Sequence, residues 1–500
     1  MTTRGCKNSL AALLLASVTM FAGLAQAESL VRVGTVRSGA FGPIEVHRSV
    51  GDYASAVANQ GAVFEGLVGV SPEGGTHFVL AEDIVPEDQS AKNWLIKLRH
   101  GVKFHDGKEL DSADVIWSIK RMTREGMIPA GMVGPIEKLE AVDKYTVRLV
   151  LPKPKSWVID SFSDPYAAIV ENGYEPGKPP VGTGPMKISD LQTQQSITLT
   201  KFDGYHGTPA ASDKVVVQFF SESQAGLNAL QNKQIDMLMD FDPALADEVE
   251  GDETLKLYNS PTGVAYPIQM RSDVAPFNDP RLREALRLVV DRDMVVNNAF
   301  NGYATVANDL YARADPYFRT DLQRKRDVEK ARKLVQDAGL AGTTLTLVTM
   351  GDPAQALVLA ENAKEIGLTI EVKQLDSASF YNEEYMERAF FGGDYWPPMS
   401  FLQTSSMVDA PNASFGQIRW NDPEYFKQWE VANASLDPAV KKQSLDELQK
   451  ILFDRGAWIV AAYPNELILM DASLSGLPKS DIWGRTGYRH LADLHKDVTQ

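Results

Sequence analysis

The sequence predicts an α/β protein of two or three domains. A chain of 500 residues is longer than one ordinary domain. Within residues 344–372, the strand-like segment TLTLVTM, a helix-forming segment and the strand-like segment LTIEV follow one another, which is the pattern of a parallel βαβ unit. The composition, with 44% hydrophobic and 23% charged residues, is that of a folded globular chain.

The first 27 residues have the features of a secretory signal peptide. Arg4 and Lys7 precede an apolar stretch over residues 10–25, and Ala25-Gln26-Ala27 provides small residues at the cleavage positions. The stretch is shorter than the ~20 apolar residues of a membrane span. The sequence therefore predicts export with cleavage after Ala27, most simply into a Gram-negative periplasm. A retained signal anchor is the alternative.

The remaining elements follow from local patterns. Helices are expected after Asp111 or Ser112, after Asp279-Pro280 and after Asp437-Pro438, because Asp and Ser cap helices and Pro suits a first helical turn. A passage rich in Pro and Gly, 173–185, predicts a crossing between domains. Strands are expected where apolar residues alternate or gather: 31–36, 63–70, 93–99, 146–151 and 196–200.

Composition and missing motifs exclude several classes of function. The formal charge of −16 disfavours nucleic acid as a partner. The single Cys, Cys6, lies in the predicted signal peptide, so the exported chain has no disulfide or thiolate metal site. We find no nucleophile elbow, Walker or EF-hand sequence and no compact His cluster, and so expect no enzyme, cofactor or metal. A glycosidase that uses two distant carboxylates stays open.

Several ordered motifs resemble one protein family. Residues 80–121 contain Leu98-Arg99, Val102, Phe104, Asp106-Gly107 and the helix opening Ala113-Asp114-Val115, and this spacing resembles the N-terminal signature of family 5 solute-binding proteins, the dipeptide/oligopeptide-type receptors of bacterial ABC importers. The resemblance extends over essentially the whole exported chain through four more segments: FEGL (64–67), PVGTGPMKI (180–188), PFNDPRLREAL (276–286) and DYWPPMSFL (394–402).

The resemblance implies a fold of the periplasmic binding protein type II-like class, cluster C type. In that fold two α/β lobes are joined by a hinge, and an additional domain is inserted in the first. Carried onto this chain, the inserted domain covers 65–179 and lobe II covers 263–477. Lobe I is then expected to consist of three segments: 28–64, 180–262 and 478–500.

The resemblance also implies a ligand site. Asp394 matches an Asp that holds the α-ammonium group of the peptide in oligopeptide-binding relatives; its alternative role is to cap a turn. Arg271 stands where many relatives have Asn, and we expect it either to bind a ligand carboxylate or to pair with Asp273 on the surface. Further candidates for contact, each of which is otherwise a core or surface residue, are Phe391, Tyr395, Trp396, Asp52, Tyr53, Tyr266 and Trp483.

The implied function is ligand capture by lobe closure and delivery to the permease and ATPase of an importer, with the receptor a monomer. A short peptide or another amino-acid-containing zwitterion is the expected ligand. The same receptor specific for an opine-like or sugar-derived ligand is the first alternative. An exported hydrolase and a periplasmic chaperone are the others, distinguished by turnover of ligand and by broad binding of unfolded chains.

Overall fold

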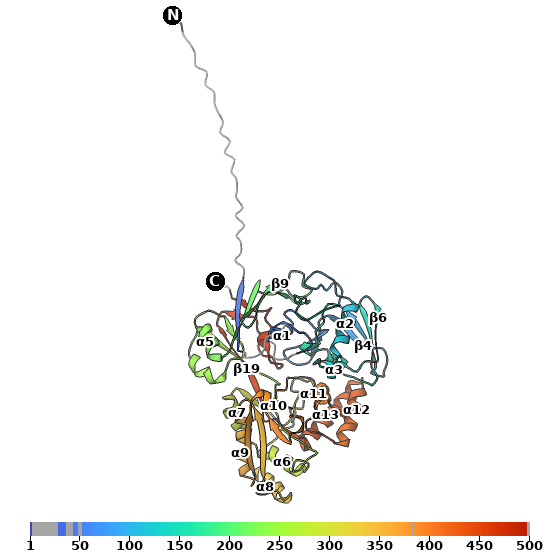
Figure 1. Cartoon of the computed structure of the whole chain (residues 1–500), viewed down its shortest axis with the longest axis vertical. Coiled ribbons are helices and arrows are strands. Elements are labelled where there is room, and N and C mark those ends of the chain that lie inside the picture. Colours follow the sequence, from blue (N-terminus) through green and yellow to red (C-terminus); the bar gives the residue numbers. More distant parts are fainter. Residues whose placement is uncertain (3–28, 37–43, 49–52, 383–384, 498–500) are drawn as a thin grey trace.

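The computed structural model describes residues 1–2, 29–36, 44–48, 53–382 and 385–497. The predicted signal peptide and Asp52 therefore lie outside the described residues, apart from Met1 and Thr2. Within the described part of the chain, no helix combines the length and the apolar character needed to cross a bilayer. Figure 1 shows an upper part that contains α1, α2 and α5 and a lower part that contains α6 to α13.

The largest sheet, here called the large sheet, lies in the upper part (Figure 1). Its central strand β1 pairs in parallel with β10 on one side and with β11 on the other. Strand β14 pairs with β19 outside the main order β12-β19-β11-β1-β10-β9-β8. The strands are β1 (Leu30–Val36), β8 (Met186–Gln192), β9 (Ser196–Lys201), β10 (Lys214–Phe220), β11 (Met237–Leu238), β12 (Leu255–Pro261), β14 (Ala304–Val306) and β19 (Ala462–Asp471).

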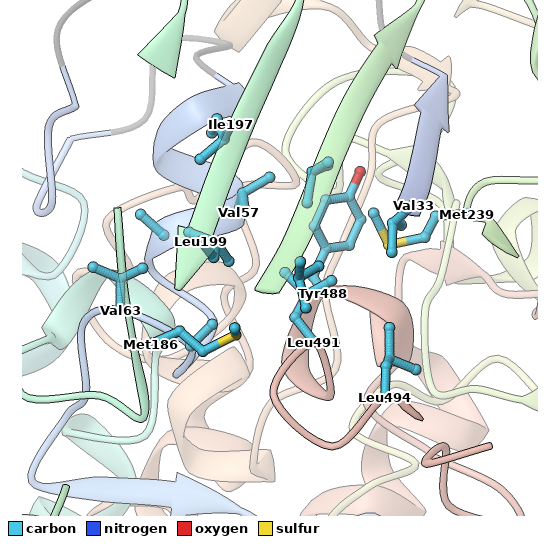
Figure 2. Packing of buried hydrophobic residues seen from close by; sticks show 14 of the residues in the cluster. Val33, Val57, Val63, Met186, Ile197, Leu199, Met239, Tyr488, Leu491 and Leu494 are labelled. Atoms are coloured by element: carbon cyan, nitrogen blue, oxygen red, sulfur yellow. The ribbon is translucent and has the colours of Figure 1, made fainter. Parts of the chain in front are cut away.

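Both faces of the large sheet are covered. Helix α1 (Tyr53–Ala58) and helix α14 (Thr486–Arg489) pack on one face, where Val57 and Tyr488 join Val33 in one buried cluster (Figure 2). Helix α5 (Ser223–Gln231) covers the opposite face through a second cluster. Burial on both faces explains the apolar run Val215–Val217 in the central strand β10.

The five-stranded sheet lies in the lower part, together with α8 and α9 (Figure 1). Its order is β16-β15-β17-β13-β18, and helix α9 (Ala354–Lys364) connects the parallel strands β15 and β16, so the predicted βαβ unit is confirmed. Asp279 caps helix α6 (Pro280–Val289) as predicted. The remaining elements here are β13 (Ile268–Met270), β15 (Thr344–Met350), β16 (Thr369–Leu375), β17 (Phe390–Gly392), β18 (Trp458–Ile459), α7 (Arg292–Phe300) and α8 (Val328–Asp337).

A separate antiparallel sheet, the four-stranded sheet, lies within the range predicted for the inserted domain. Its order is β4-β5-β7-β6, and helix α2 (Ser112–Met122) packs against it. Asp111 caps this helix through a capping box with Asp114, which confirms the predicted helix start. The strands are β4 (Ala81–Pro86), β5 (Asn93–Leu98), β6 (Lys138–Asp143) and β7 (Thr146–Val150).

The remaining elements belong to none of these three sheets. Asp437 caps α13 as predicted. Helix α3 contacts α11 where the upper and lower parts meet (Figure 1). The elements are β2 (Val68–Val70), β3 (Thr76–Phe78), α3 (Ala130–Val133), α4 (Val158–Ser161), α10 (Ser377–Phe380), α11 (Phe401–Val408), α12 (Pro423–Ala434), α13 (Pro438–Arg455), β20 (Leu474–Ser475), β21 (His495–Lys496) and the 3₁₀ helices η1 (Pro165–Ala167), η2 (Pro243–Val249) and η3 (Tyr385–Glu387).

Two crossings between the parts can be located in the chain. The segment PVGTGP returns to the large sheet, and a Cβ at Gly182 or Gly184 would collide with the backbone of residues 61–63, so this close approach requires glycine. Strand β19 lies in the large sheet although it falls inside 263–477, the range expected for lobe II. The chain therefore returns to the large sheet within β19, which pairs with β14 at residues 462–464 and with β12 at residues 465–471.

Candidate functional site

A cavity of about 500 Å³ lies where the two parts and the four-stranded region meet. One wall carries Met132 of α3 and Asp164, which precedes η1. A second wall is the segment from Asp394 to Met399, and the third is the segment from Trp483 to Arg489. Enclosure on three sides and a volume within the ~300–1,000 Å³ of small-molecule sites make this the candidate ligand cavity.

Asp394 is the main carboxylate on the second wall, which belongs to the lower part of the molecule. Its side chain accepts a hydrogen bond from the Tyr381 hydroxyl at 2.6 Å and another from the Tyr385 hydroxyl. Gln417 in turn donates to the Tyr385 oxygen at 2.8 Å. Burial raises the pKa of Asp394, and the two tyrosine hydrogen bonds oppose that rise by stabilising the carboxylate. The result is a buried, oriented acceptor in the cavity wall.

The backbone explains how Asp394 reaches the cavity. Strand β17 ends at Gly392, and Gly393 follows with φ +86°, a conformation that favours glycine. A Cβ at Gly393 would also collide with the Met350 carbonyl of the neighbouring strand β15. The chain can therefore leave the sheet edge sharply at this point and turn Asp394 toward the cavity.

Aromatic rings form the apolar part of the same wall. Trp396 is 6% exposed and pairs through its backbone with Ala265, with Trp396 N donating to Ala265 O at 3.0 Å. Tyr395 and Phe415 also line the cavity. Phe391 is completely buried behind this layer, where its ring lies 5.7 Å from that of Tyr385. Phe391 therefore supports the wall but does not line it.

Two lining side chains keep a buried polar oxygen without a hydrogen-bond partner among the described residues. These atoms are Gln403 Oε1 and Gln417 Oε1. The Trp396 side chain acts on Asp394 instead, and its hydrogen bond opposes the rise in the pKa of that carboxyl. Buried polar groups are normally paired, and leaving one unpaired costs about 1–3 kcal/mol. Two unpaired acceptors are typical of a wall that binds a ligand with hydrogen-bond donors.

The third wall, the segment from Trp483 to Arg489, carries two guanidinium groups. Arg489 forms a salt bridge with the fully buried Asp481, and burial lowers the pKa of Arg489 to about 10. Arg485 lies with its Cζ 5.7 Å from the ring centroid of Tyr395. Burial raises the pKa of Asp164 to about 6, and the positive charge of Arg485 acts in the opposite direction. The two walls therefore present opposite charges at Asp394 and Arg485.

A second cavity of about 800 Å³ adjoins the first. The two cavities share Tyr395, Gly484 and Arg485 in their linings. Tyr266 lines the second cavity, and its ring meets that of Tyr395 edge-on at 5.8 Å. The side chains of Tyr395 and Arg485 thus mark the border between the two spaces.

The structure gathers four of the predicted contact residues around the candidate ligand cavity: Asp394, Tyr395, Trp396 and Trp483. Tyr266 lies in the second cavity, and Phe391 lies behind the wall. Tyr53 begins α1, while the Tyr53 side chain and Asp52 are outside what the structure describes. Trp483 is anchored by its indole N–H, which donates to Ser71 O at 2.8 Å.

Arg271, which is predicted either to bind a ligand carboxylate or to pair with Asp273, lines neither of these two cavities. Its guanidinium forms salt bridges with Asp273 at 2.8 Å and with Glu387 at 2.7 Å. Both partners raise the pKa of Arg271, the hydrogen bonds with Asp273 most strongly. The alternative prediction, a pair with Asp273, is the one that this geometry matches.

Sequence reasoning missed Tyr381, Tyr385, Gln417, Asp164 and Arg485. None of them belongs to a recognised motif, and they come from segments that are far apart in the chain. The only local signal is the position of Arg485, two residues after Trp483 in the final crossing. Among the described residues, no group of three or more His, Cys, Asp and Glu side chains is arranged to hold a metal ion.

Comparison with known proteins shows the same fold and family. The glutathione-binding protein GsiB of Salmonella typhi is 26% identical over 491 residues, which cover 90% of this chain and 92% of that protein. The structure of AgaA from A. tumefaciens with agropinic acid matches with a TM-score of 0.78 at 22% identity, over 94% of this chain and 99% of that one. DppA from Helicobacter pylori with the peptide STSA matches with a TM-score of 0.77 at 17% identity, over 94% and 99%.

These likenesses confirm the predicted fold class, two α/β lobes of the type II-like class. The predicted domain boundaries stay a prediction. The family model of the bacterial extracellular solute-binding proteins, family 5, matches residues 77–411, about two thirds of the chain. The chain therefore belongs to the family 5 bacterial extracellular solute-binding proteins.

Proposed function

We propose that this protein is the periplasmic receptor of an ABC importer for a short peptide or another amino-acid-containing zwitterion. Family membership and the predicted signal peptide support the placement in the periplasm. The permease and ATPase of the importer are its proposed partners. The receptor acts by binding and release, without turnover of the ligand.

Asp394 is the observation that carries the choice of ligand. A buried carboxylate held by two tyrosine hydroxyls is an acceptor already oriented for a cationic group. An ammonium group provides three donors and the opposite charge. A charge-assisted hydrogen bond of this kind contributes about 1.5–3 kcal/mol.

The polar atoms around the cavity support an amide-containing ligand. A peptide unit provides both an N–H donor and a C=O acceptor. The unpaired oxygens of Gln403 and Gln417 need donors, which the N–H of a peptide unit provides. An opine such as the agropinic acid bound by AgaA offers related groups, and this makes an opine the second candidate ligand.

Closure of the two lobes is the proposed mechanism. Ligand groups that contact the Asp394 wall and the Trp483–Arg489 wall at once lower the free energy of the closed state relative to the open one. The closed, loaded protein is then the form that docks on the permease. A hydrolase would release products from such a ligand, whereas a receptor returns it unchanged.

Native mass spectrometry of the protein as purified, followed by calorimetric titration, tests the proposal. We expect a retained mass in the range of a short peptide or an opine, and binding of tri-alanine or glutathione without turnover. The variant D394N should weaken binding about 10- to 100-fold. The control D273N removes a carboxylate of the lower part that lies outside both cavities, and should bind as the wild type does. Equal affinity of D394N and wild type would reject the ammonium site.

A further inference from the structure

We infer that Arg485 binds a carboxylate of the ligand, opposite Asp394, so that the receptor selects molecules with an ammonium group and a carboxylate at separate positions. This inference rests on the proposed function and narrows its ligand class. It replaces the expectation for Arg271, whose guanidinium is paired with Asp273 and Glu387.

The position of Arg485 is imposed by its neighbours. Gly484 and Arg485 both have positive φ, at +66° and +54°, and this tight turn follows directly after Trp483. The left-handed region is unfavourable for Arg, and such strain persists where surrounding contacts fix the backbone. Here Trp483 N donates to Asp481 at 3.0 Å, and Thr486 N donates to Glu466 at 2.9 Å. The turn holds the Arg485 side chain at the border of both cavities.

The chemistry of the guanidinium group suits the role. Arg has five N–H donors in a planar fork, which matches both oxygens of a carboxylate. Its Cζ lies 5.7 Å from the Tyr395 ring centroid, an arrangement in which the ring restricts the side chain through a cation–π contact. Asp164, whose carboxylate also accepts from Tyr166 N at 2.8 Å, is close enough to sense the charge of Arg485. Asp164 and Arg485 both belong to the lining of the candidate ligand cavity, so this charge is exerted within the cavity.

The two charged residues belong to different parts of the molecule. Asp394 follows β17 of the five-stranded sheet. Arg485 directly precedes α14, whose Tyr488 is buried with Val33 and Leu491 in the core beneath the large sheet (Figure 2). A zwitterion that engages both residues connects the two parts, while a ligand with only one charge contacts one side. Closure is therefore expected to depend on both charges of the same molecule.

A pair of probes that differ only in the carboxylate tests this inference. Tri-alanine and tri-alanine amide are titrated by calorimetry into wild type, R485N and R271N. Asn tolerates the left-handed conformation, so R485N removes the guanidinium without imposing a new backbone. We expect wild type and R271N to bind the acid about 10- to 100-fold more tightly than the amide, and R485N to bind the two equally. Thermal unfolding checks that each variant is folded, and R485G, equally compatible with positive φ, replaces R485N if it is not.

Each outcome has a defined meaning. An undiminished preference of R485N for the acid would overturn the role of Arg485. Binding of acid and amide with equal affinity by wild type, when D394N weakens both, would overturn the inference and leave the proposed function in place. Binding of neither probe by wild type would count against the proposed peptide ligand, and the inference would fail with it. The variant R485K keeps the charge without the fork and should retain only part of the preference.

Discussion

A group of four hydrogen bonds, here called the clasp, connects the region of the four-stranded sheet to the end of α12. Asn433 accepts from Trp157 Nε1 at 2.9 Å and donates to Pro154 O at 2.8 Å. Ser156 N donates to Asn433 O at 2.8 Å, and Ser156 Oγ donates to Ala432 O at 2.7 Å. The clasp lies outside the lining of both cavities, so we expect it to stabilise the closed state without touching ligand.

The change N433A removes the two side-chain hydrogen bonds of the clasp. At about 1 kcal/mol each, the closed state loses about 2 kcal/mol, and more if the Trp157 N–H stays buried without a partner. Trp157 is 2% exposed, which makes that additional cost relevant. In the open state water can satisfy the same groups. Because about 1.4 kcal/mol corresponds to a factor of ten, the apparent Kd of the ligand should rise about 30-fold.

Calorimetry with the ligand found by native mass spectrometry gives the Kd, and small-angle X-ray scattering gives the closed fraction with and without ligand. The control N232A removes an exposed Asn at the end of α5, whose side chain donates to Asn228 O. The variant W157F removes the same hydrogen bond from the other side, and combination with N433A should give less than the sum of the two effects. A folded N433A protein with the wild-type Kd would refute the role of the clasp in closure.

Two further predictions concern stability. Burial lowers the pKa of His47 from 6.5 to about 4, so the unfolded state binds more protons between these values, and acidification from pH 7 to 4 should cost about 3 kcal/mol. Urea unfolding of H47Q, which keeps a donor for Ala168 O, should show a shallower loss over this range; an identical pH profile would contradict the assignment. G182A should lower the free energy of unfolding by about 1–3 kcal/mol, and with it the melting temperature, because its Cβ meets the Val63 carbonyl. In the control G416A the new Cβ makes only ordinary contacts, so the melting temperature should not change. Equal melting of the two would count against the close approach.

The sequence predicted those parts of the fold that depend on local signals. The Asp–Pro start of α6 and the capped start of α2 need only neighbouring residues, and α9 between β15 and β16 needs only one periodic segment. The place of β19 in the large sheet could not be predicted in this way, since its partners β12 and β14 lie about 150 to 210 residues earlier in the chain. Long-range pairing, and not local propensity, decides to which sheet that strand belongs.

The residues of the candidate site fall into the same two groups: those with a local sequence signal and those that only the fold brings together. Asp394 and its aromatic neighbours belong to one contiguous motif, and the resemblance to a family identified them together. Arg485, Tyr381 and Gln417 meet Asp394 only because separate loops converge. Arg271 is the opposite case. Its spacing from Phe277 in the sequence suggested a place in the site, but in the structure its guanidinium forms salt bridges with two nearby carboxylates.

Strand β19 determines the kind of movement that the two parts can make. Residues 462–464 pair with β14, and residues 465–471 pair with β12, so one continuous hydrogen-bonded strand extends through the crossing. Thr262 adds a cross-link there by donating from Oγ1 to Pro464 O at 2.6 Å. A strand that is hydrogen-bonded on either side of the crossing bends elastically, and the two parts that it connects cannot move apart freely. We therefore expect a narrow range of opening angles and a restoring force that returns the empty protein to one preferred aperture.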